Sequence, residues 1–136
     1  MTISARIENA EGIHVAQVKT NDTLQSVAIP SRSTGFGSSL NGGELLFLAL
    51  ATCYCNDVYR EAARRNLAVQ RVEVEVKGDF GGEGEPAKKI EYQALVVTNG
   101  TDEQTLELMQ ATDKVAEIQN SLRAGVPVKF VSARSG

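Results

Sequence analysis

The chain has 136 residues, a length that fits one folded domain with a core large enough to need no disulfide or metal staple. Its 14 Lys and Arg residues are outnumbered by 17 Asp and Glu residues, which gives a formal net charge of -3. Nucleic-acid-binding surfaces show a clustered basic excess, so this balance predicts no nucleic-acid partner.

Neither a membrane segment nor a secreted disulfide framework is indicated by the sequence. The longest apolar run, residues 45–51, is much shorter than the ~20 residues of a membrane-spanning helix. The N-terminal residues MTISARIENAEG alternate and carry charge, unlike a signal peptide. The two cysteines, Cys53 and Cys55, are spaced C-x-C, which does not suggest a framework of structural disulfides. We therefore expect a cytoplasmic protein with no membrane association.

Three short strands are predicted near the N-terminus. In the first, Ile3, Ala5 and Ile7 alternate with polar residues, as in a strand with one buried face. The predicted strands cover residues 3–7, 13–19 and 24–29, with turns at 9–12 and 21–22 and a stop at Pro30. The chain thus opens as a β-meander. Residues 31–43, rich in Ser and Gly, are predicted to form a loop that leads into a helix.

A long helix is predicted for residues 43–66, GELLFLALATCYCNDVYREAARRN. Its first half, residues 45–55, is apolar on every face, and such a helix must be covered on all sides. At ~1.5 Å per residue the helix would run about 36 Å, longer than one small domain needs to cross its own core. We therefore expect something beyond a single sheet to cover it.

The second half of the chain is predicted to contain a hairpin, two helices and a last strand. Val72, Val74 and Val76 alternate with charged residues up to Gly78, which indicates a strand with one exposed face. A connection at 81–87 and a second strand at 90–96 are predicted to complete a hairpin. A helix follows, which begins at the capping box of Thr101 and Gln104 and carries Leu106, Leu108 and Met109. The last predicted elements are a short helix with Val115, Ile118 and Leu122 that ends at Gly125, and a strand at 126–131. The order βββαββααβ predicts an α+β fold in a single domain, residues 1–136.

This order of elements and three motifs resemble the OsmC/Ohr family, the osmotically induced and organic hydroperoxide resistance proteins. The motifs are N-G-G-E-L-L at residues 41–46, Cys53 nine residues after Glu44, and N-S-L-R-A-G-V-P-V-K-F at residues 120–130. The resemblance covers nearly the whole chain and is strongest at 41–66 and 115–130. It implies an intertwined homodimer in which the long central helices of two subunits pack back to back. A partner subunit would thus supply the cover that the apolar helix needs.

The resemblance also implies an activity, the reduction of hydroperoxides by a nucleophilic cysteine in the response to oxidative stress. That chemistry needs a thiolate, a cation that lowers its pKa, and a second thiol that resolves the sulfenic acid. The reactive position falls on Cys53, but the family's Glu, Arg and second Cys fall on Gly43, Ala10 and Ala116. Glu44, next to Gly43, remains a weak candidate, although it also fits the acidic first turn of an ordinary helix. A peroxide substrate and an external thiol reductant are the small-molecule partners implied.

Cys55 is a weak alternative to the missing second thiol. Two residues on a helix are separated by a rotation of about 200°, so Cys53 and Cys55 point to opposite faces and cannot bond within one intact helix. Helix geometry does not exclude a disulfide between the two copies of this helix across a dimer axis. The other interpretation of Cys55 is an inert, buried apolar residue.

The sequence surroundings of Cys53 do not favour a thiolate. Cys53 lies some ten residues inside the helix, beyond the reach of the helix dipole, and Asp57 one turn later would disfavour the charged form. The cations that could approach Cys53 from the strands and the loop are Arg6, Lys19 and Arg32, and the sequence alone does not place them. A zinc site is disfavoured because His14, the only histidine, and two adjacent cysteines leave a tetrahedral set short of ligands, so no metal or cofactor is expected.

Two functions of different classes follow from these observations. The first is a thiol-dependent hydroperoxide reductase that uses Cys53. The second is a non-catalytic dimer that binds a small hydrophobic ligand at the subunit interface. The retained Cys53 favours the first, and the departures at Ala10, Gly43 and Ala116 favour the second.

Overall fold

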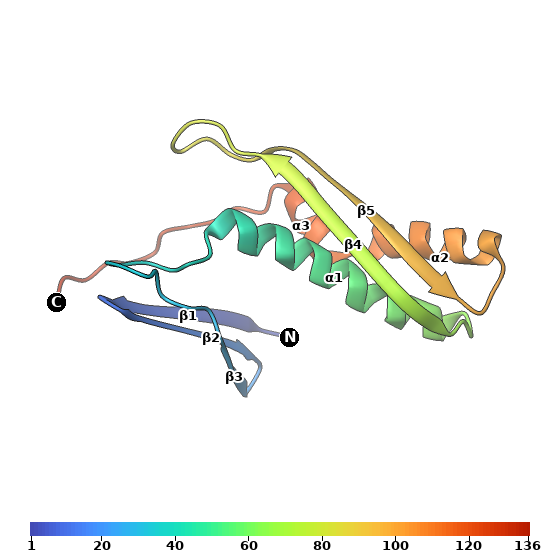
Figure 1. The fold of residues 1–136 in the computed structure, drawn as a ribbon, viewed down its shortest axis with the longest axis horizontal. Coiled ribbons are helices and arrows are strands. Elements are labelled where there is room, and N and C mark those ends of the chain that lie inside the picture. Colours follow the sequence, from blue (N-terminus) through green and yellow to red (C-terminus); the bar gives the residue numbers. More distant parts are fainter. The chain divides into compact units, whose positions relative to one another are not determined.

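The computed structural model describes residues 1–136, and its elements follow one another in the order βββαββαα (Figure 1). They are β1 (Ile3–Ala10), β2 (Ile13–Thr20), β3 (Thr23–Val27), α1 (Gly42–Arg64), β4 (Val69–Asp79), β5 (Lys88–Thr98), α2 (Asp102–Val115) and α3 (Glu117–Ala124). The chain forms two compact units, Met1–Leu46 and Phe47–Gly136, with the start of α1 in the first. Each unit is described by itself.

The first unit is the predicted β-meander, an antiparallel sheet in the order β1-β2-β3. Gly12 in the first turn has φ 70°, a left-handed conformation that glycine adopts without strain. Asn21 in the second turn has φ 50°, which asparagine tolerates better than most residues, and its side chain accepts a hydrogen bond from Thr2 N. Turn chemistry therefore fixes where these strands end.

The predicted buried face of this meander is open within its own unit. Ile3, Ile7 and Leu24 are 63%, 56% and 59% exposed, and Ala16 is the one buried residue of the unit. The alternation of the sequence thus predicts the strands correctly, but the unit contains no second layer to cover their apolar side chains.

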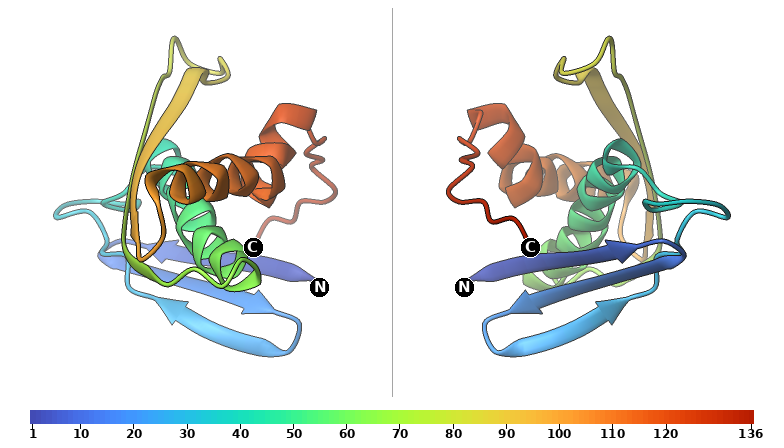
Figure 2. Two further views of the ribbon diagram at one scale, coloured as in Figure 1. Left: turned by 90° about the vertical axis from the view of Figure 1, so that its right-hand side faces the viewer. Right: turned by 90° about the vertical axis from the view of Figure 1, so that its left-hand side faces the viewer.

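The second unit has a core between α1, α2 and the β4–β5 hairpin. The buried cluster consists of Tyr54, Val58 and Ala62 on α1 and Leu108 on α2. The half-buried side chains packed against it, mostly from the hairpin, are Leu67, Val69, Val72, Val74, Tyr92, Ala94 and Val96. Figure 2 shows both helices on the same side of the hairpin. Apolar and charged residues therefore alternate along β4 for the predicted reason, because one face of the strand packs on the core and the other is exposed.

One stripe of α1 is buried, rather than all of its faces. Leu50, Tyr54, Val58 and Ala62 recur every four residues and are at most 3% exposed. Leu48, which lies off this stripe, is 58% exposed. Within the chain, α1 therefore keeps an uncovered apolar surface.

The two C-terminal helices agree with the predicted caps. Thr101 and Gln104 form the capping box of α2, each side chain bonded to the other's backbone N–H. Gly125 ends α3 in the left-handed conformation at φ 63°. Val115 is corrected from the short helix to the last residue of α2, because the chain leaves helical geometry at Ala116.

The predicted last strand at residues 126–131 is wrong for this chain by itself. These residues belong to no helix or strand, and Val128, Phe130 and Val131 are 98%, 89% and 87% exposed. A strand needs a neighbour to bond its backbone groups, and no other segment of the chain pairs with this one. Without a neighbouring strand, the apolar alternation of this segment does not produce a strand in the structure.

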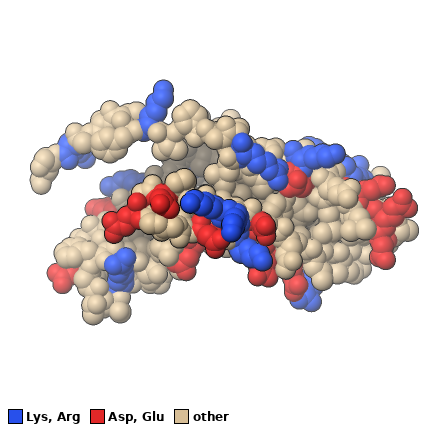
Figure 3. Space-filling view, turned by 90° about the horizontal axis from the view of Figure 1, so that it is seen from above, with Lys and Arg blue, Asp and Glu red and all other residues tan.

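Charges of both signs are interspersed on the face drawn in Figure 3, in line with the balanced composition. None of the three helices combines the length and apolar character needed to cross a membrane.

Candidate functional site

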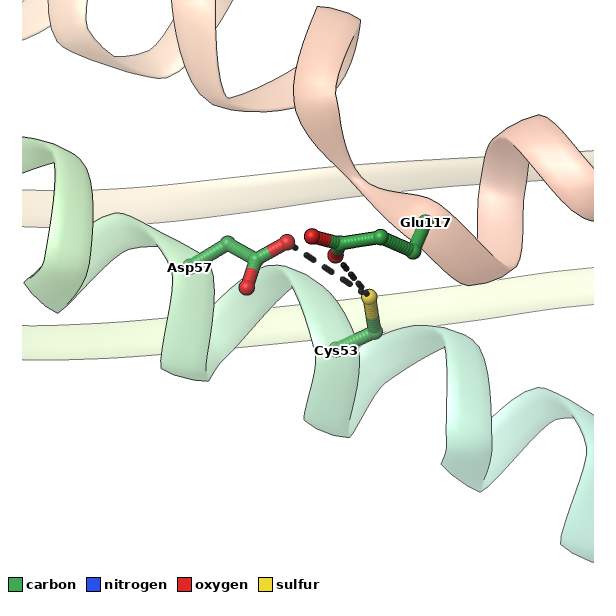
Figure 4. A group of neighbouring side chains, drawn as sticks. All are labelled: Cys53, Asp57 and Glu117. Carbon is green, nitrogen blue, oxygen red and sulfur yellow. Dashed lines mark hydrogen bonds between the residues drawn. The ribbon is translucent and has the colours of Figure 1, made fainter. Parts of the chain in front are cut away.

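Cys53 lies in the middle of α1, half-buried, with two carboxylates beside its sulfur (Figure 4). Its Sγ is 3.6 Å from Asp57 Oδ2 and 3.8 Å from Glu117 Oε2, and the thiol is the donor in both contacts. Since one S–H carries one proton, it can donate to only one carboxylate at a time. The thiol therefore faces two alternative proton acceptors.

Helix geometry brings this group together. Asp57 follows Cys53 by four residues, so its side chain lies over the next turn on the same face of α1. Glu117 is the first residue of α3 and arrives from the break at Ala116. Farther along α3, Gln119 Nε2 donates to Leu50 O at 3.0 Å, which ties this helix to α1 one turn before Cys53. That bond holds Glu117 over the thiol.

Arg60 supplies the positive charge of the site. Its Nη1 lies 3.0 Å from Glu117 Oε1 and 3.3 Å from Asp57 Oδ1, and its Nε lies 3.5 Å from Glu61 Oε2. Arg60 is spaced seven residues from Cys53, again the same face of the helix. The guanidinium binds the carboxylates and not the sulfur, so it compensates their charge.

The thiol is held in its protonated form by these surroundings. Burial is the main cause that raises the pKa of Cys53. A backbone hydrogen bond at Ile118 lowers the pKa in part, and the neighbouring Asp57 and Glu117 raise it again. The sequence-based prediction that Asp57 disfavours the thiolate agrees with this arrangement. Cys53 therefore enters any reaction as a thiol that must lose its proton.

The two carboxylates differ in how readily they hold a proton. Burial and the neighbouring Glu117 raise the pKa of Asp57, which is 6% exposed. Hydrogen bonds from its own backbone N–H and from Asp57, together with Arg60, lower the pKa of Glu117. Asp57 is therefore the carboxylate of the pair that takes up a proton more readily, and Glu117 the one that stays ionised to lower pH.

Cys53, Asp57 and Glu117 also form the one group whose ligand atoms are spaced for a metal ion, all within 4.8 Å of one another. The expectation of no zinc site counted only histidine and cysteine, and it missed the carboxylates. A thiolate and two carboxylates are three ligands of a kind that zinc accepts. Arg60 already binds both carboxylates, so a metal ion would have to displace its guanidinium.

The weaker candidates lie apart from this group. Cys55 is a free, half-buried thiol two residues beyond Cys53, on a different face of α1. Glu44 accepts a hydrogen bond from Asn41 N while its own N–H bonds Asn41 Oδ1, which makes it part of a helix cap. The structure thus gives Glu44 a local structural role.

Two of the three candidate cations of the first unit have partners of their own. Arg6 Nη1 lies 3.3 Å from Glu8 Oε2, and Arg32 Nε donates to Ser38 O at 3.3 Å. Lys19 is exposed and makes no ion pair. The cation of the site is instead Arg60.

Two members of the site, Arg60 and Glu117, were missed by sequence reasoning, although signals for both were present. The spacing of Arg60 from Cys53 and Asp57 places the three on one helix face. Glu117 directly follows Ala116, the position matched to the family's second cysteine. A residue next to that position is expected near Cys53, and its carboxylate is there.

Comparison with known proteins agrees with the fold. The sequence model of the OsmC-like protein family matches residues 35–131. The structure is similar to the OsmC-like protein of Mycoplasma pneumoniae, with 15% identity, 92% of this chain and 87% of that chain covered, and a TM-score of 0.60. It is also similar to the organic hydroperoxide resistance protein OsmC of Legionella pneumophila, with 15% identity, 90% of each chain covered and a TM-score of 0.58.

A third similar structure is an OsmC-like hydroperoxide resistance protein from Jannaschia sp., with 16% identity, 98% of this chain and 93% of that chain covered, and a TM-score of 0.53. No curated protein gives a significant match. These structural likenesses show the shared α+β fold, and the family match covers most of the sequence. The chain therefore belongs to the OsmC-like protein family.

Proposed function

We propose that this protein is a thiol-dependent hydroperoxide reductase in which Cys53 is the nucleophile. The observation that carries the proposal is the contact of the Cys53 thiol with Asp57 and Glu117, with Arg60 bound to both carboxylates. A family match and a fold shared with proteins described as hydroperoxide resistance proteins support it. The site offers a nucleophile, a proton acceptor and a compensating cation.

A carboxylate would act as the general base and accept the thiol proton as the sulfur attacks the peroxide. The sulfur attacks the terminal oxygen of R–OOH, the O–O bond breaks, and the leaving R–O⁻ takes up the proton as R–OH. Cys53 is left as the sulfenic acid. Because Ala116 stands where the family has its second cysteine, an external thiol must attack the sulfenic sulfur and release water.

Two equivalents of external thiol complete the cycle. The first forms a mixed disulfide with Cys53, and the second releases Cys53 as the thiol together with the oxidised reductant. A compartment rich in small thiols or dithiols would supply them, which is consistent with a cytoplasmic protein. Cys53 is half-buried and not sealed in the core, so an external thiol can reach it.

A homodimer is part of this proposal. The exposed apolar residues of β1 to β3, the uncovered Leu48 and the unpaired segment 126–131 are surfaces that a second copy would cover. Size-exclusion chromatography with light scattering should give twice the chain mass of 14.6 kDa. A species of one chain mass at micromolar concentration would contradict the dimer.

The alternative is a non-catalytic dimer that binds a small hydrophobic ligand at the subunit interface. It is favoured by the raised pKa of Cys53 and by the amount of apolar surface that the chain leaves exposed. In this case the fold is retained without the chemistry, since fold alone does not decide function. The two functions differ in one measurable property, turnover of peroxide.

We expect the purified protein with excess dithiol to consume an alkyl hydroperoxide, and the Cys53→Ser variant to fall to the uncatalysed rate. Cys55→Ser is the matched control, because it removes a thiol of similar exposure from another face of the same helix. It should keep most of the activity. Equal, background-level consumption by all three proteins would refute the reductase and leave the ligand-binding alternative.

A further inference from the structure

The loop between β3 and α1 is closed on itself. Ser39 N donates a hydrogen bond to Pro30 O at 2.9 Å, and Arg32 N donates to Gly37 O at 3.2 Å. Both bonds join one side of the loop to the other across its base. Residues 30–39 therefore form one compact piece of backbone, which a small number of bonds can hold in place or release.

Two hydrogen bonds tie this loop to the β1–β2 hairpin. Gly12 N in the hairpin turn donates to Gly35 O at 3.4 Å, a long distance for an N–H donor. Gly37 N donates to Asn9 Oδ1 at 3.0 Å, the usual length of such a bond. Asn9, the next-to-last residue of β1, is therefore the main anchor of the loop.

The Asn9 side chain also contacts His14, the one histidine of the chain. The two residues face each other across the antiparallel pair of β1 and β2, and Asn9 Nδ2 lies 3.0 Å from His14 Nδ1. Gly37 N–H can only donate, so the amide oxygen of Asn9 must face Gly37 and the amide NH₂ must face His14. His14 Nδ1 therefore has to accept a hydrogen bond, which requires a neutral ring with its proton on Nε2.

Protonation of His14 is incompatible with this arrangement. A charged imidazole donates from both nitrogens, so its Nδ1–H would point at the NH₂ group of Asn9. Turning the amide over would satisfy the ring, but it would place the NH₂ group against Gly37 N–H. One of the two Asn9 bonds must break in either case, and only the neutral ring keeps both.

Few charged groups share the surroundings of His14. Glu11 in the hairpin turn and Arg32 in the loop are the charged residues of the segments beside it, and β3 carries none. The charged residues of β1 and β2 lie on the opposite face of the sheet, and they are Arg6, Glu8 and Lys19. Histidine ordinarily takes up its proton between pH 8 and pH 5, where carboxylate and guanidinium groups ordinarily keep their charges. A change at Gly37 over this range therefore reports the ring.

We propose that Asn9, His14 and Gly37 form a pH-sensitive latch on the loop. The latch is closed while the His14 ring is neutral, and protonation of the ring releases residues 30–39 from the β1–β2 hairpin, leaving only the long bond from the hairpin turn. All of its residues lie in the first unit, whereas Cys53 lies in the second. The latch therefore goes beyond the proposed reductase and does not depend on it.

The test follows the ring and the loop by NMR of the ¹⁵N-labelled protein. At pH 8 a long-range ¹H–¹⁵N spectrum should show His14 with Nδ1 unprotonated and Nε2 protonated. As the pH is lowered to 5, the Gly37 amide signal should shift with the same midpoint as the ring. Its protection against solvent exchange, corrected for the intrinsic effect of pH, should fall roughly threefold to tenfold, the contribution of one hydrogen bond.

Two substitutions separate the latch from a general effect of pH. Asn9→Asp provides two acceptor oxygens, one for Gly37 N–H and one for the protonated ring, so Gly37 should stay protected at pH 5. His14→Gln provides an acceptor that does not titrate and should remove the pH dependence. Either variant decides the question if the other does not fold.

Four results would each overturn the proposal. They are a ring with Nδ1 protonated at pH 8, a Gly37 signal that does not follow the ring, an equal loss of protection in Asn9→Asp and the unchanged protein, and an unchanged pH dependence in His14→Gln.

Discussion

Leu108→Ala should lower the free energy of unfolding by about 3 kcal/mol, because it leaves a cavity in a fully buried part of the core. Leu108 is 0% exposed and is the member of the buried cluster that α2 contributes. Leu106→Ala, on the same helix but 58% exposed, should change stability by less than about 0.5 kcal/mol. Urea denaturation at one fixed protein concentration measures both.

Similar losses in these two variants would contradict the assignment of the core between α1, α2 and the β4–β5 hairpin. A loss confined to Leu106→Ala would show that the other face of α2 is the buried one. Either outcome would place Cys53 and Glu117 differently from the arrangement in Figure 4, since the same packing of helices positions both.

Asp57→Asn and Glu117→Gln should each make Cys53 more reactive toward iodoacetamide at pH 7, by about two- to fivefold, the size of one part-exposed charge interaction. Removing a negative charge next to the sulfur lowers the thiol pKa, which both carboxylates raise. Glu117→Gln also leaves Arg60 without that carboxylate, which adds to the effect. The measurement uses a Cys55→Ser background, so that one thiol reacts.

The pH dependence has a definite sign. Because the folded protein raises the pKa of Cys53, the alkylation rate should rise with pH and reach half its maximum above the value for a free thiol. In both variants the midpoint should move to lower pH. Glu107→Gln, an exposed carboxylate on α2, is the control and should leave it unchanged. A midpoint equal to that of the free thiol in the unchanged protein would contradict the described site.

Asp57 and Glu117 have two opposite effects on the reaction of a peroxide reductase. They reduce the thiolate fraction at neutral pH, which slows attack. They also place a proton acceptor in contact with the thiol, and Arg60 keeps their charge compensated. A carboxylate and a guanidinium are thus present near Cys53, although Gly43 and Ala10 stand at the positions where the family pattern has them.

Much of the fold could be predicted because its signals are local. The alternation of Val72, Val74 and Val76 follows directly from one buried face, and Thr101 with Gln104 forms the capping box that their spacing indicates. The turns at Gly12 and Asn21 end strands by backbone conformation alone. In each case the residues that determine the strand, cap or turn lie within or next to it in the sequence.

What could not be predicted depends on distant parts of the chain or on another chain. Residues 126–131 alternate like a strand, but pairing requires a neighbour that this chain does not provide. Glu117 reaches Cys53 only because the helix breaks at Ala116 and Gln119 anchors α3 to Leu50. No periodicity in the sequence reports a contact across 64 residues.

The most direct test of the account is to locate the sulfenic acid. The protein is treated with one equivalent of an alkyl hydroperoxide in the presence of dimedone, and tandem mass spectrometry assigns the adduct within the peptide that holds both cysteines. We expect one adduct, on Cys53, and none on Cys55. An adduct on Cys55, or none on either residue while the peroxide is consumed, would contradict the assignment of Cys53 as the nucleophile.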